Sequence, residues 1–387
     1  MTHLKADWNY PNSIRAGAGR IAELPDACSQ LAIQRPFLVT DPGLSKLPMV
    51  QEAVDVCRVA ALDCGVFDDV QSNPTGENVD AGVAAYREGG RDGVIAFGGG
   101  SALDAAKAIA LMVGQERPLW DFEDDGDNWT RVNEAGIAPI VAVPTTAGTG
   151  SEVGRASVIK DEAVHLKRII FHPRMLPSLV ILDPNLSVGL PPHITAATGM
   201  DALSHNLEAL CSPYYHPMAE GIAIEGVRLV KEYLPRAVAD GNDLEARMQM
   251  LVASSMGAAA FQKGLGGMHA LAHPLGALYD AHHGLLNAIL MPYLLQANRP
   301  AISEKIERLS RYLALGNPGF DAFHAWVMEL REQIDIPHAL AAIAIDDSDA
   351  ERVGRMASED PSASGNPIPF DAGRYASIFS DAVNGRL

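Results

Sequence analysis

Short apolar runs alternate with amphipathic segments through the first half of the chain. The run at 92–101 (DGVIAFGGGS) is strand-like and ends in three glycines, and apolar residues recur with helical spacing directly after it, at 102–113. Comparable strand-like runs lie at 36–41, 58–67, at the start of 138–152, and at 179–184. Because strands alternate with helices, the pattern predicts an α/β fold with a parallel sheet covered by helices on both faces.

The pattern changes after about residue 190. From there the chain consists mostly of long Ala-, Leu- and Met-rich segments with helical periodicity and few strand signals. Two prolines and a glycine punctuate SVGLPPH, near 187–192, and we place a domain boundary there. We therefore expect an α/β domain over 1–188 and an all-helical domain over 189–387. The turn-rich stretch 359–369 (EDPSASGNPIP) is interpreted as a surface loop.

Composition adds limits on partners and location. A chain of 387 residues with 48% apolar residues is long enough for two cores. The net charge of −18 argues against nucleic acid or an anionic membrane as a partner. Four cysteines without a CxxC pair suit a reducing compartment, and no signal-like N-terminus or apolar run near 18 residues is present. We expect a cytoplasmic protein, and a homodimer or higher homo-oligomer on general frequency.

A glycine-rich stretch, FGGGSALDAAK at 97–107, joins a predicted strand to a predicted helix. Glycines there allow backbone N–H groups to approach a pyrophosphate, and the N-terminus of the helix adds partial positive charge. Ser101 can cap the helix or donate to a phosphate. The alternative is a tight strand–helix turn that binds nothing.

A second loop, PTTAGTGSE at 144–152, follows another predicted strand and carries three threonines. Open α/β sheets bind ligands at the carboxyl ends of their strands, which favours a ligand shared by the two loops. The alternative is an ordinary helix start, because TGSE resembles a capping box.

Asp41 ends the strand-like run PFLVTD. An acid at such a position can accept hydrogen bonds from ribose hydroxyls and would repel a 2′-phosphate, so the sequence favours NAD over NADP. A turn or N-cap role ahead of Pro42 explains the same residue equally well.

Histidines and one aspartate recur one helical turn apart in the second half of the chain. Asp201 and His205 are four residues apart, and so are His269 and His273, with a pair of histidines at 282–283 further on. Imidazole ligands suit Zn, Fe, Ni or Co, and a carboxylate shifts the preference toward Fe(II). The alternative is that each is an ordinary polar residue, although burying such pairs without a partner would be costly.

Four ordered motifs are similar to those of the iron-containing alcohol dehydrogenases. They are GGGSALDAAK, PTTAGTGSE, TGMDALSH and HALAHPLGALYDAHHG, and the match runs from AGAGR (16–20) to NAILMPYLLQAN (287–298), about three-quarters of the chain. This metal-dependent family is related to lactaldehyde reductase, glycerol dehydrogenase and dehydroquinate synthase. The resemblance implies a dehydroquinate synthase-like fold, with a dinucleotide-binding α/β domain and an all-helical metal-binding domain.

The resemblance also implies roles for single residues. The metal ligands would be Asp201, His205, His269 and His283, around Fe(II) with Zn as the alternative. His273 would handle a proton or contact the nicotinamide, and His282 matches a position where the family does not require histidine. The NAD-binding residues would be Asp41, Gly98, Gly99, Gly100 and Ser101, then Asp104, Thr145, Thr146 and Thr149, and, on weaker matches, Asn73 and Lys167.

These roles imply an NAD(H)- and divalent-metal-dependent alcohol dehydrogenase that acts on a small alcohol or hydroxy acid. A hydroxyacid–oxoacid transhydrogenase would use the same site. A lyase of the dehydroquinate synthase kind would need additional basic residues near the metal motifs, and few are present. A non-catalytic metal or nucleotide sensor would bind without turnover.

Two cations depart from the family pattern. Arg155 stands where many relatives have an apolar or small residue, and Lys263 lies in FQKGLG, where asparagine is frequent nearby. We hypothesise that one of them meets an anionic group of the substrate. The alternative is that both are surface or ion-paired residues.

Overall fold

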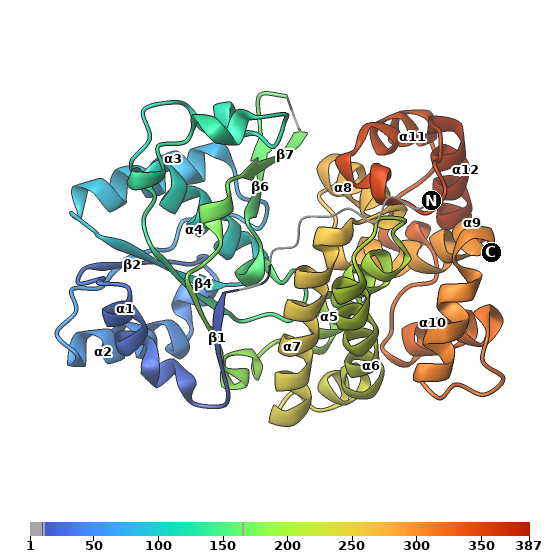
Figure 1. The fold of residues 1–387 in the computed structure, drawn as a ribbon, viewed down its shortest axis with the longest axis horizontal. Coiled ribbons are helices and arrows are strands. Elements are labelled where there is room, and N and C mark those ends of the chain that lie inside the picture. The colour runs from blue at the N-terminus through green and yellow to red at the C-terminus, as the bar shows by residue number, and fades with distance from the viewer. Residues whose placement is uncertain (1–9, 11, 165) are drawn as a thin grey trace. The chain divides into compact units, whose positions relative to one another are not determined.

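The computed structural model describes residues 10, 12–164 and 166–387. The chain divides into two compact units, Pro11–Gly189 and Leu190–Leu387, and Tyr10 is grouped with the second. The first unit contains the sheet and the second is helical (Figure 1).

The first unit is built on a six-stranded sheet in the order β1-β8-β5-β4-β2-β3, and every pair of neighbours is parallel. β2 and β4 are buried along their whole length, because helices cover both faces of the sheet. This confirms the predicted parallel α/β fold. The strands are β1 (Ser13–Ala16), β2 (Pro36–Val39), β3 (Gly65–Phe67), β4 (Gly93–Gly98), β5 (Ile140–Pro144) and β8 (Leu179–Leu182).

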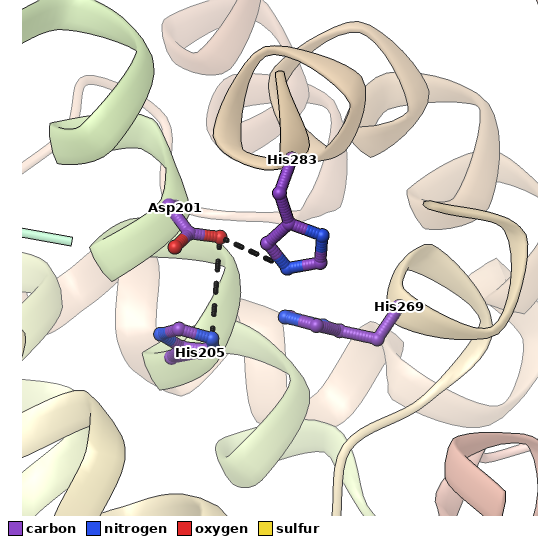
Figure 2. A group of neighbouring side chains, drawn as sticks. All are labelled: Asp201, His205, His269 and His283. Carbon is purple, nitrogen blue, oxygen red and sulfur yellow. Dashed lines mark ion pairs between the residues drawn. The ribbon is translucent and has the colours of Figure 1, made fainter. Parts of the chain in front are cut away.

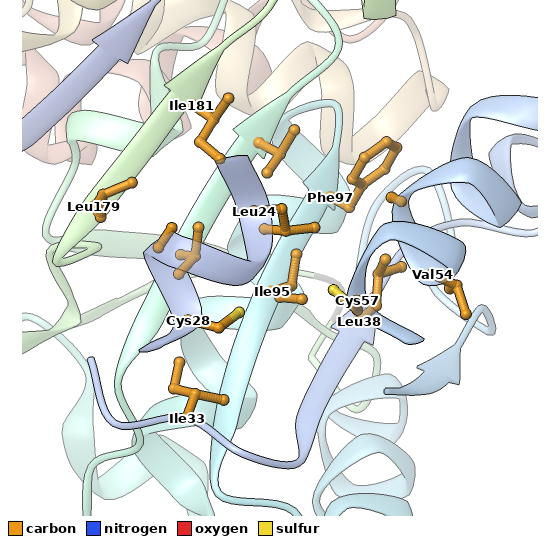
Figure 3. Close-up of a cluster of buried hydrophobic side chains, with 14 of the residues drawn as sticks. Leu24, Cys28, Ile33, Leu38, Val54, Cys57, Ile95, Phe97, Leu179 and Ile181 are labelled. Carbon is orange, nitrogen blue, oxygen red and sulfur yellow. The ribbon is translucent and has the colours of Figure 1, made fainter. Parts of the chain in front are cut away.

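Helices α1 (Leu24–Gln30) and α2 (Pro48–Val59) pack on one face of this sheet, and α3 (Gly76–Glu88) and α4 (Gly100–Met112) lie on the other (Figure 1). Figure 3 shows the core under α1 and α2, where Leu24 and Cys28 meet Ile95 of β4. Side chains alternate between the faces of a strand, so every second residue of β4 points into this core. All four cysteines are free thiols.

A two-stranded antiparallel hairpin, β6 (Ala156–Asp161) and β7 (Leu166–Phe171), follows the loop after β5. The sequence pattern did not predict this hairpin or β1. β1 is only four residues long and mostly exposed, so it lacks the apolar run that marks a buried strand in the sequence.

The second unit contains no strand among its described residues. Its central helix, α5, is buried at nearly every position, and its buried residues include polar ones such as Asp201, His205 and Glu208. None of the helices in the described residues has the length and apolar character that a membrane span requires. The helices are α5 (Pro192–Cys211), α6 (Pro217–Ala239), α7 (Leu244–Ala260), α8 (Gly267–Tyr279), α9 (His283–Tyr312), α10 (Phe320–Gln333), α11 (Ala350–Glu359) and α12 (Ala372–Asn384).

The stretch 359–369, predicted as a surface loop, contains a short 3₁₀ helix, Pro361–Gly365, of which only Gly365 is buried. A side chain at Gly365 would lie 2.0 Å from the carbonyl oxygen of Leu265. The Asn366 oxygen accepts from the backbone N–H of Gly267 at 3.0 Å and from the Asn298 amide at 2.9 Å. The prediction is therefore wrong for Gly365 and Asn366, which are buried, whereas other residues of the stretch, such as Pro361 and Ser364, are exposed. Asn366 satisfies buried groups of the protein rather than water.

Candidate metal centre and dinucleotide-binding edge

Four side chains of the helical unit converge on one point (Figure 2). Asp201 and His205 lie one turn apart on α5, His269 is on α8, and His283 is the first residue of α9. One potential ligand atom from each lies within 4.8 Å of all the others. The Asp201 Oδ1 atom is 3.7 Å from His283 Nε2 and 4.0 Å from His205 Nε2. The structure therefore brings together all four residues of the predicted metal shell.

The protonation states suit a cation. Burial by itself would raise the pKa of Asp201, but His205, His283 and His269 lower it to about 2, so the carboxylate is ionised. Burial, and after it the charge of His205, holds the pKa of His269 well below its ordinary value, so this imidazole is neutral. An ionised carboxylate and a neutral imidazole are the forms that bind a metal ion.

Glu208 orients His269. Its Oε2 atom lies 2.7 Å from His269 Nδ1, and its two oxygens also accept from the backbone N–H groups of Gly266 at 2.8 Å and Met268 at 2.7 Å. With Nδ1 as the donor, Nε2 of His269 keeps its lone pair for the cluster. Burial raises the pKa of Glu208 to about 7, although these backbone hydrogen bonds oppose it.

Sequence reasoning missed Glu208, yet a signal was present. It stands seven residues after Asp201, on the same face of α5, between Leu207 and Ala209. An acid at that spacing, on the face that already carries Asp201 and His205, is the expected outer partner of a ligand.

Asn287 lies one turn after His283 on α9 and is fully buried. Its amide Nδ2 donates to Asp201 Oδ1 at 2.9 Å and lies 3.2 Å from Nε2 of both His269 and His283. The amide therefore touches three of the four converging groups, and its bond to one oxygen of Asp201 fixes the orientation of the carboxylate.

The four residues fit a divalent metal ion. One ionised carboxylate and three imidazoles form a donor set typical of Fe(II) and Zn sites, and outer partners already orient two of the four. Donor atoms held at roughly 2.1 Å from one ion are separated from each other by about 3–4 Å. The four ligand atoms lie within 4.8 Å of one another, so small side-chain movements would bring them to these separations. This donor set suits both Fe(II) and Zn.

His273 lies beside the four residues rather than among them. Its ring stacks on that of His283, with centroids 5.4 Å apart, and its Nδ1 is 2.9 Å from Asp360 Oδ2. Asp360 comes from the stretch predicted as a surface loop, so sequence reasoning missed this partner. Burial would raise the pKa of Asp360, but His273 outweighs this effect and the pKa lies below its ordinary value.

His282 has a structural role. It is the N-cap residue of α9, and its Nδ1 accepts from the backbone N–H of Leu285 at 3.4 Å. It stands outside the group of four converging side chains.

In the α/β unit, the two predicted loops lie side by side at the carboxyl ends of β4 and β5. The backbone N–H of Thr145 donates to the Gly98 carbonyl at 2.9 Å. A side chain at Gly100 would lie 2.5 Å from Thr149, and one at Gly99 would lie 3.4 Å from Thr146. Gly98 has φ of 143°, which side chains rarely tolerate. Glycine at 100 therefore lets the two loops approach each other closely, and glycine at 98 permits the backbone turn into α4.

Asp41 stands at the end of the neighbouring strand, β2. Its Oδ1 accepts from the backbone N–H groups of Gly43 and Leu44, both at 2.9 Å, which is the turn role noted as the alternative. Its Oδ2 points toward the glycine loop, 3.8 Å from the Cβ position of Gly98. The hydroxyls of Thr40 and Thr145 are buried without a hydrogen-bond partner among the described residues. Polar groups at this edge are thus available to a ligand.

Two other predicted cofactor residues, Asp104 and Ser101, form hydrogen bonds within the α/β unit. Asp104 accepts from Ser151 Oγ at 2.6 Å and from the backbone N–H of Val158 at 2.9 Å, so it anchors the loop after β5 to α4. The Ser101 hydroxyl donates to the Ser72 carbonyl. Asn73 follows Ser72 in the chain, and Lys167 lies on β7. That any of these residues contacts a dinucleotide stays a prediction.

Lys263 does not face a substrate. Its side chain is 0% exposed, and its Nζ lies 2.8 Å from Glu220 Oε1 and 3.0 Å from the Leu210 carbonyl oxygen. The hypothesis that this cation recognises an anionic substrate is wrong for Lys263, because Glu220 already neutralises it in the interior.

The pairing of this α/β unit with a helical unit that carries one aspartate and three histidines is typical of metal-dependent, dinucleotide-linked oxidoreductases. The family model for iron-containing alcohol dehydrogenase matches residues 11–184, and that for the C-terminal domain of the same family matches 195–383. The chain therefore belongs to the iron-containing alcohol dehydrogenase family, as the sequence motifs indicated, and is an oxidoreductase.

Individual relatives agree with this assignment over nearly the whole chain. A 4-hydroxybutyrate dehydrogenase from Cupriavidus necator is 37% identical over 97% of this chain and 99% of its own. The crystal structure of a 1,3-propanediol oxidoreductase has a TM-score of 0.93 at 35% identity, covering 98% of this chain and 100% of its own. The structure of sulfoacetaldehyde reductase from Bifidobacterium kashiwanohense in complex with NAD+ has a TM-score of 0.89 at 28% identity, covering 98% of each chain.

Proposed function

We propose that this protein is an NAD(H)-dependent, divalent-metal-dependent dehydrogenase that interconverts a small alcohol or hydroxy acid with its aldehyde or ketone. The observation that carries the proposal is the convergence of Asp201, His205, His269 and His283 within 4.8 Å in the helical unit. A homodimeric or higher homo-oligomeric state and a cytoplasmic location accompany this proposal as predictions.

These four residues would hold Fe(II) or Zn. When bound, such an ion supplies a Lewis acid that lowers the pKa of a substrate alcohol. The chain itself prepares the ligands. Glu208 keeps the Nε2 lone pair of His269 directed at the cluster, and Asn287 fixes one oxygen of Asp201. Asp201 adds the one formal negative charge of the shell, which offsets part of the charge of a divalent ion.

The edge formed by β2, β4 and β5 would hold the dinucleotide. The backbone of Gly98–Ser101 and the N-terminus of α4 suit a pyrophosphate, with Thr145, Thr146 and Thr149 beside it. Asp41 Oδ2 suits a ribose hydroxyl and would repel a 2′-phosphate, which favours NAD. When bound, NAD supplies the carbon that accepts or donates hydride. Asp104, Asn73 and Lys167 remain secondary candidates for cofactor contacts.

His273 would move the proton. Asp360 accepts from its Nδ1, which leaves Nε2 as the atom that takes up or releases a proton. Pairing with a buried carboxylate holds the ring in this tautomer, as in other aspartate–histidine pairs.

The relatives support this reaction class. Their names specify a 4-hydroxybutyrate dehydrogenase, a 1,3-propanediol oxidoreductase and an NAD+ complex of a sulfoacetaldehyde reductase. Small alcohols and hydroxy acids are therefore the substrates to test first.

The direct test is NADH formation by the Fe(II)- or Zn-loaded protein with 4-hydroxybutyrate, 1,4-butanediol, 1,3-propanediol and 1-butanol. We expect turnover of at least one of them, with kcat/KM for NAD+ at least roughly tenfold above that for NADP+, since a 2′-phosphate would face Asp41. Binding of NAD+ without turnover of any alcohol or of the matching aldehydes would contradict the proposal. Transfer between a hydroxy acid and an oxo acid with no release of NADH would identify a transhydrogenase instead.

A further inference from the structure

The first turn of α8 is capped by side chains from elsewhere in the chain. Its N-cap residue is Gly266, which has no side chain that could accept a hydrogen bond. The backbone N–H groups of Gly266 and Met268 donate to Glu208 at 2.8 and 2.7 Å, and the N–H group of Gly267 donates to Asn366 Oδ1 at 3.0 Å. Two distant residues therefore do the work that a local N-cap does in most helices.

This turn carries the metal ligand His269, which is the third residue of α8. The first N–H groups of a helix have no partner within the helix, so the groups that accept from them fix the place of the first turn. Glu208 is one such acceptor and also orients the His269 ring. The other is Asn366, which stands 99 residues after Gly267 in the sequence. The location of His269 thus depends on Asn366 as well as on Glu208.

Asn366 is itself held in place on all sides. It is 4% exposed, and its amide pairs reciprocally with that of Asn298 on α9, since each Nδ2 donates to the Oδ1 of the other at 2.9 Å. Its Nδ2 also donates to the Ile368 carbonyl at 2.7 Å. Asn366 therefore connects α8 to α9, the two helices that bring His269 and His283 together.

The chemistry of the residue suits this place. A side chain at Gly266 would lie 3.0 Å from Glu208 Oε1 and 3.2 Å from Asn366 Oδ1, so glycine lets both acceptors reach the backbone. Because Glu208 is already an acid at this point, an aspartate at 366 would place two carboxylates side by side. A neutral amide accepts from the N–H group of Gly267 without that repulsion.

The stretch 359–369 contacts α8 at a second point. Asn366 caps the helix at Gly267, and Asp360 Oδ2 lies 2.9 Å from His273 Nδ1, nearly two turns further along the helix. His269 lies between these two points in the sequence. The stretch contributes no residue to the group of four converging side chains, yet it holds the helix on both sides of one of them.

We infer that Asn366 is a positioning residue for the metal site. By capping α8 from outside and bracing it against α9, it holds His269 where this ligand can share an ion with His283. Coupling between two sites is reciprocal, so a metal ion bound by the four ligands stabilises the stretch 359–369 in return. This inference rests on the proposed metal-dependent function.

The first test is the Zn affinity of Asn366→Leu, which keeps a similar size and removes the hydrogen bonds. Measured by competition with a chromophoric chelator well below the melting temperature, the affinity should fall about tenfold, as it does when an outer partner of a ligand is lost. The matched control is Tyr293→Phe, which removes a different buried hydrogen bond of α9, to the His338 carbonyl at 3.0 Å. It should lower the melting temperature and change Zn affinity less than about threefold.

Wild-type Zn affinity in Asn366→Leu, or an equal loss in Tyr293→Phe, would overturn the inference and leave Asn366 with a role in general stability alone. A wild-type protein that binds neither Zn nor Fe(II) would instead remove the proposed function itself.

The second test uses the wild-type protein and decides the question if Asn366→Leu fails to fold. Amide hydrogen exchange is measured on the metal-free protein and after addition of one equivalent of Zn. We expect exchange in 359–369 to slow at least about threefold more than exchange in α10, which supplies none of the four ligands. Equal slowing of the two segments would show only general stabilisation by the metal and would overturn the inference.

Discussion

Replacing His269 with alanine is expected to reduce bound metal from about one equivalent to almost none and to lower kcat/KM by roughly a thousandfold or more. His269 is fully buried and is the side chain that ties α8 to the cluster on α5. Its loss would also leave Glu208 as a buried acid without its side-chain partner. Metal content by elemental analysis and steady-state kinetics on the same preparation check both expectations.

The matched control for this substitution is His282→Asn. Asparagine keeps an N-cap acceptor for α9, so we expect metal content and kcat/KM close to those of the wild type. His282 and His283 are adjacent in the sequence, and only His283 joins the converging group. If His269→Ala and His282→Asn lose metal to a similar extent, the assignment of ligands is wrong.

Replacing Glu208 with glutamine is expected to weaken metal binding by about 10- to 100-fold, the usual effect of losing an outer partner of a ligand. The carboxylate accepts three hydrogen bonds, from His269 Nδ1 and from two backbone N–H groups. Glutamine keeps the size but presents an NH₂ group to at least one of these donors. His269 can then adopt the tautomer with its proton on Nε2, which no longer binds a metal. Competition with a chromophoric chelator measures the affinity.

Glu220→Gln separates this effect from general destabilisation. Glu220 pairs with buried Lys263 and stands outside the group of four converging side chains, so its substitution should lower the melting temperature and leave metal affinity unchanged within about threefold. If Glu220→Gln loses as much metal affinity as Glu208→Gln, the loss in both variants would reflect lower stability of the helical unit and not a role of Glu208 in orienting His269.

The sequence predicted those parts of the fold and site that depend on local patterns. Apolar runs marked the buried strands β2, β4, β5 and β8, and the spacing of Asp201 and His205 placed them on one face of a helix. The resemblance to a family then selected His269 and His283 from four clustered histidines. Neither step required knowledge of tertiary contacts.

The missed features depend on contacts between distant parts of the chain. Glu208 is 61 residues from His269, and Asp360 is 87 residues from His273. A turn-rich stretch such as 359–369 has the composition of a surface loop, and only the structure shows that it covers α8. Lys263 was misjudged for the same reason, since its partner Glu220 is 43 residues away on another helix.

The central claim is that Asp201, His205, His269 and His283 hold a metal ion on which alcohol oxidation depends. Its most direct test is NADH formation by the wild-type protein after removal of metal with a chelator, then after addition of one equivalent of Fe(II), Zn or Ni. The account predicts loss of activity in the metal-free protein and recovery with Fe(II) or Zn at a stoichiometry near one. Undiminished NADH formation in protein shown to be free of metal would contradict it.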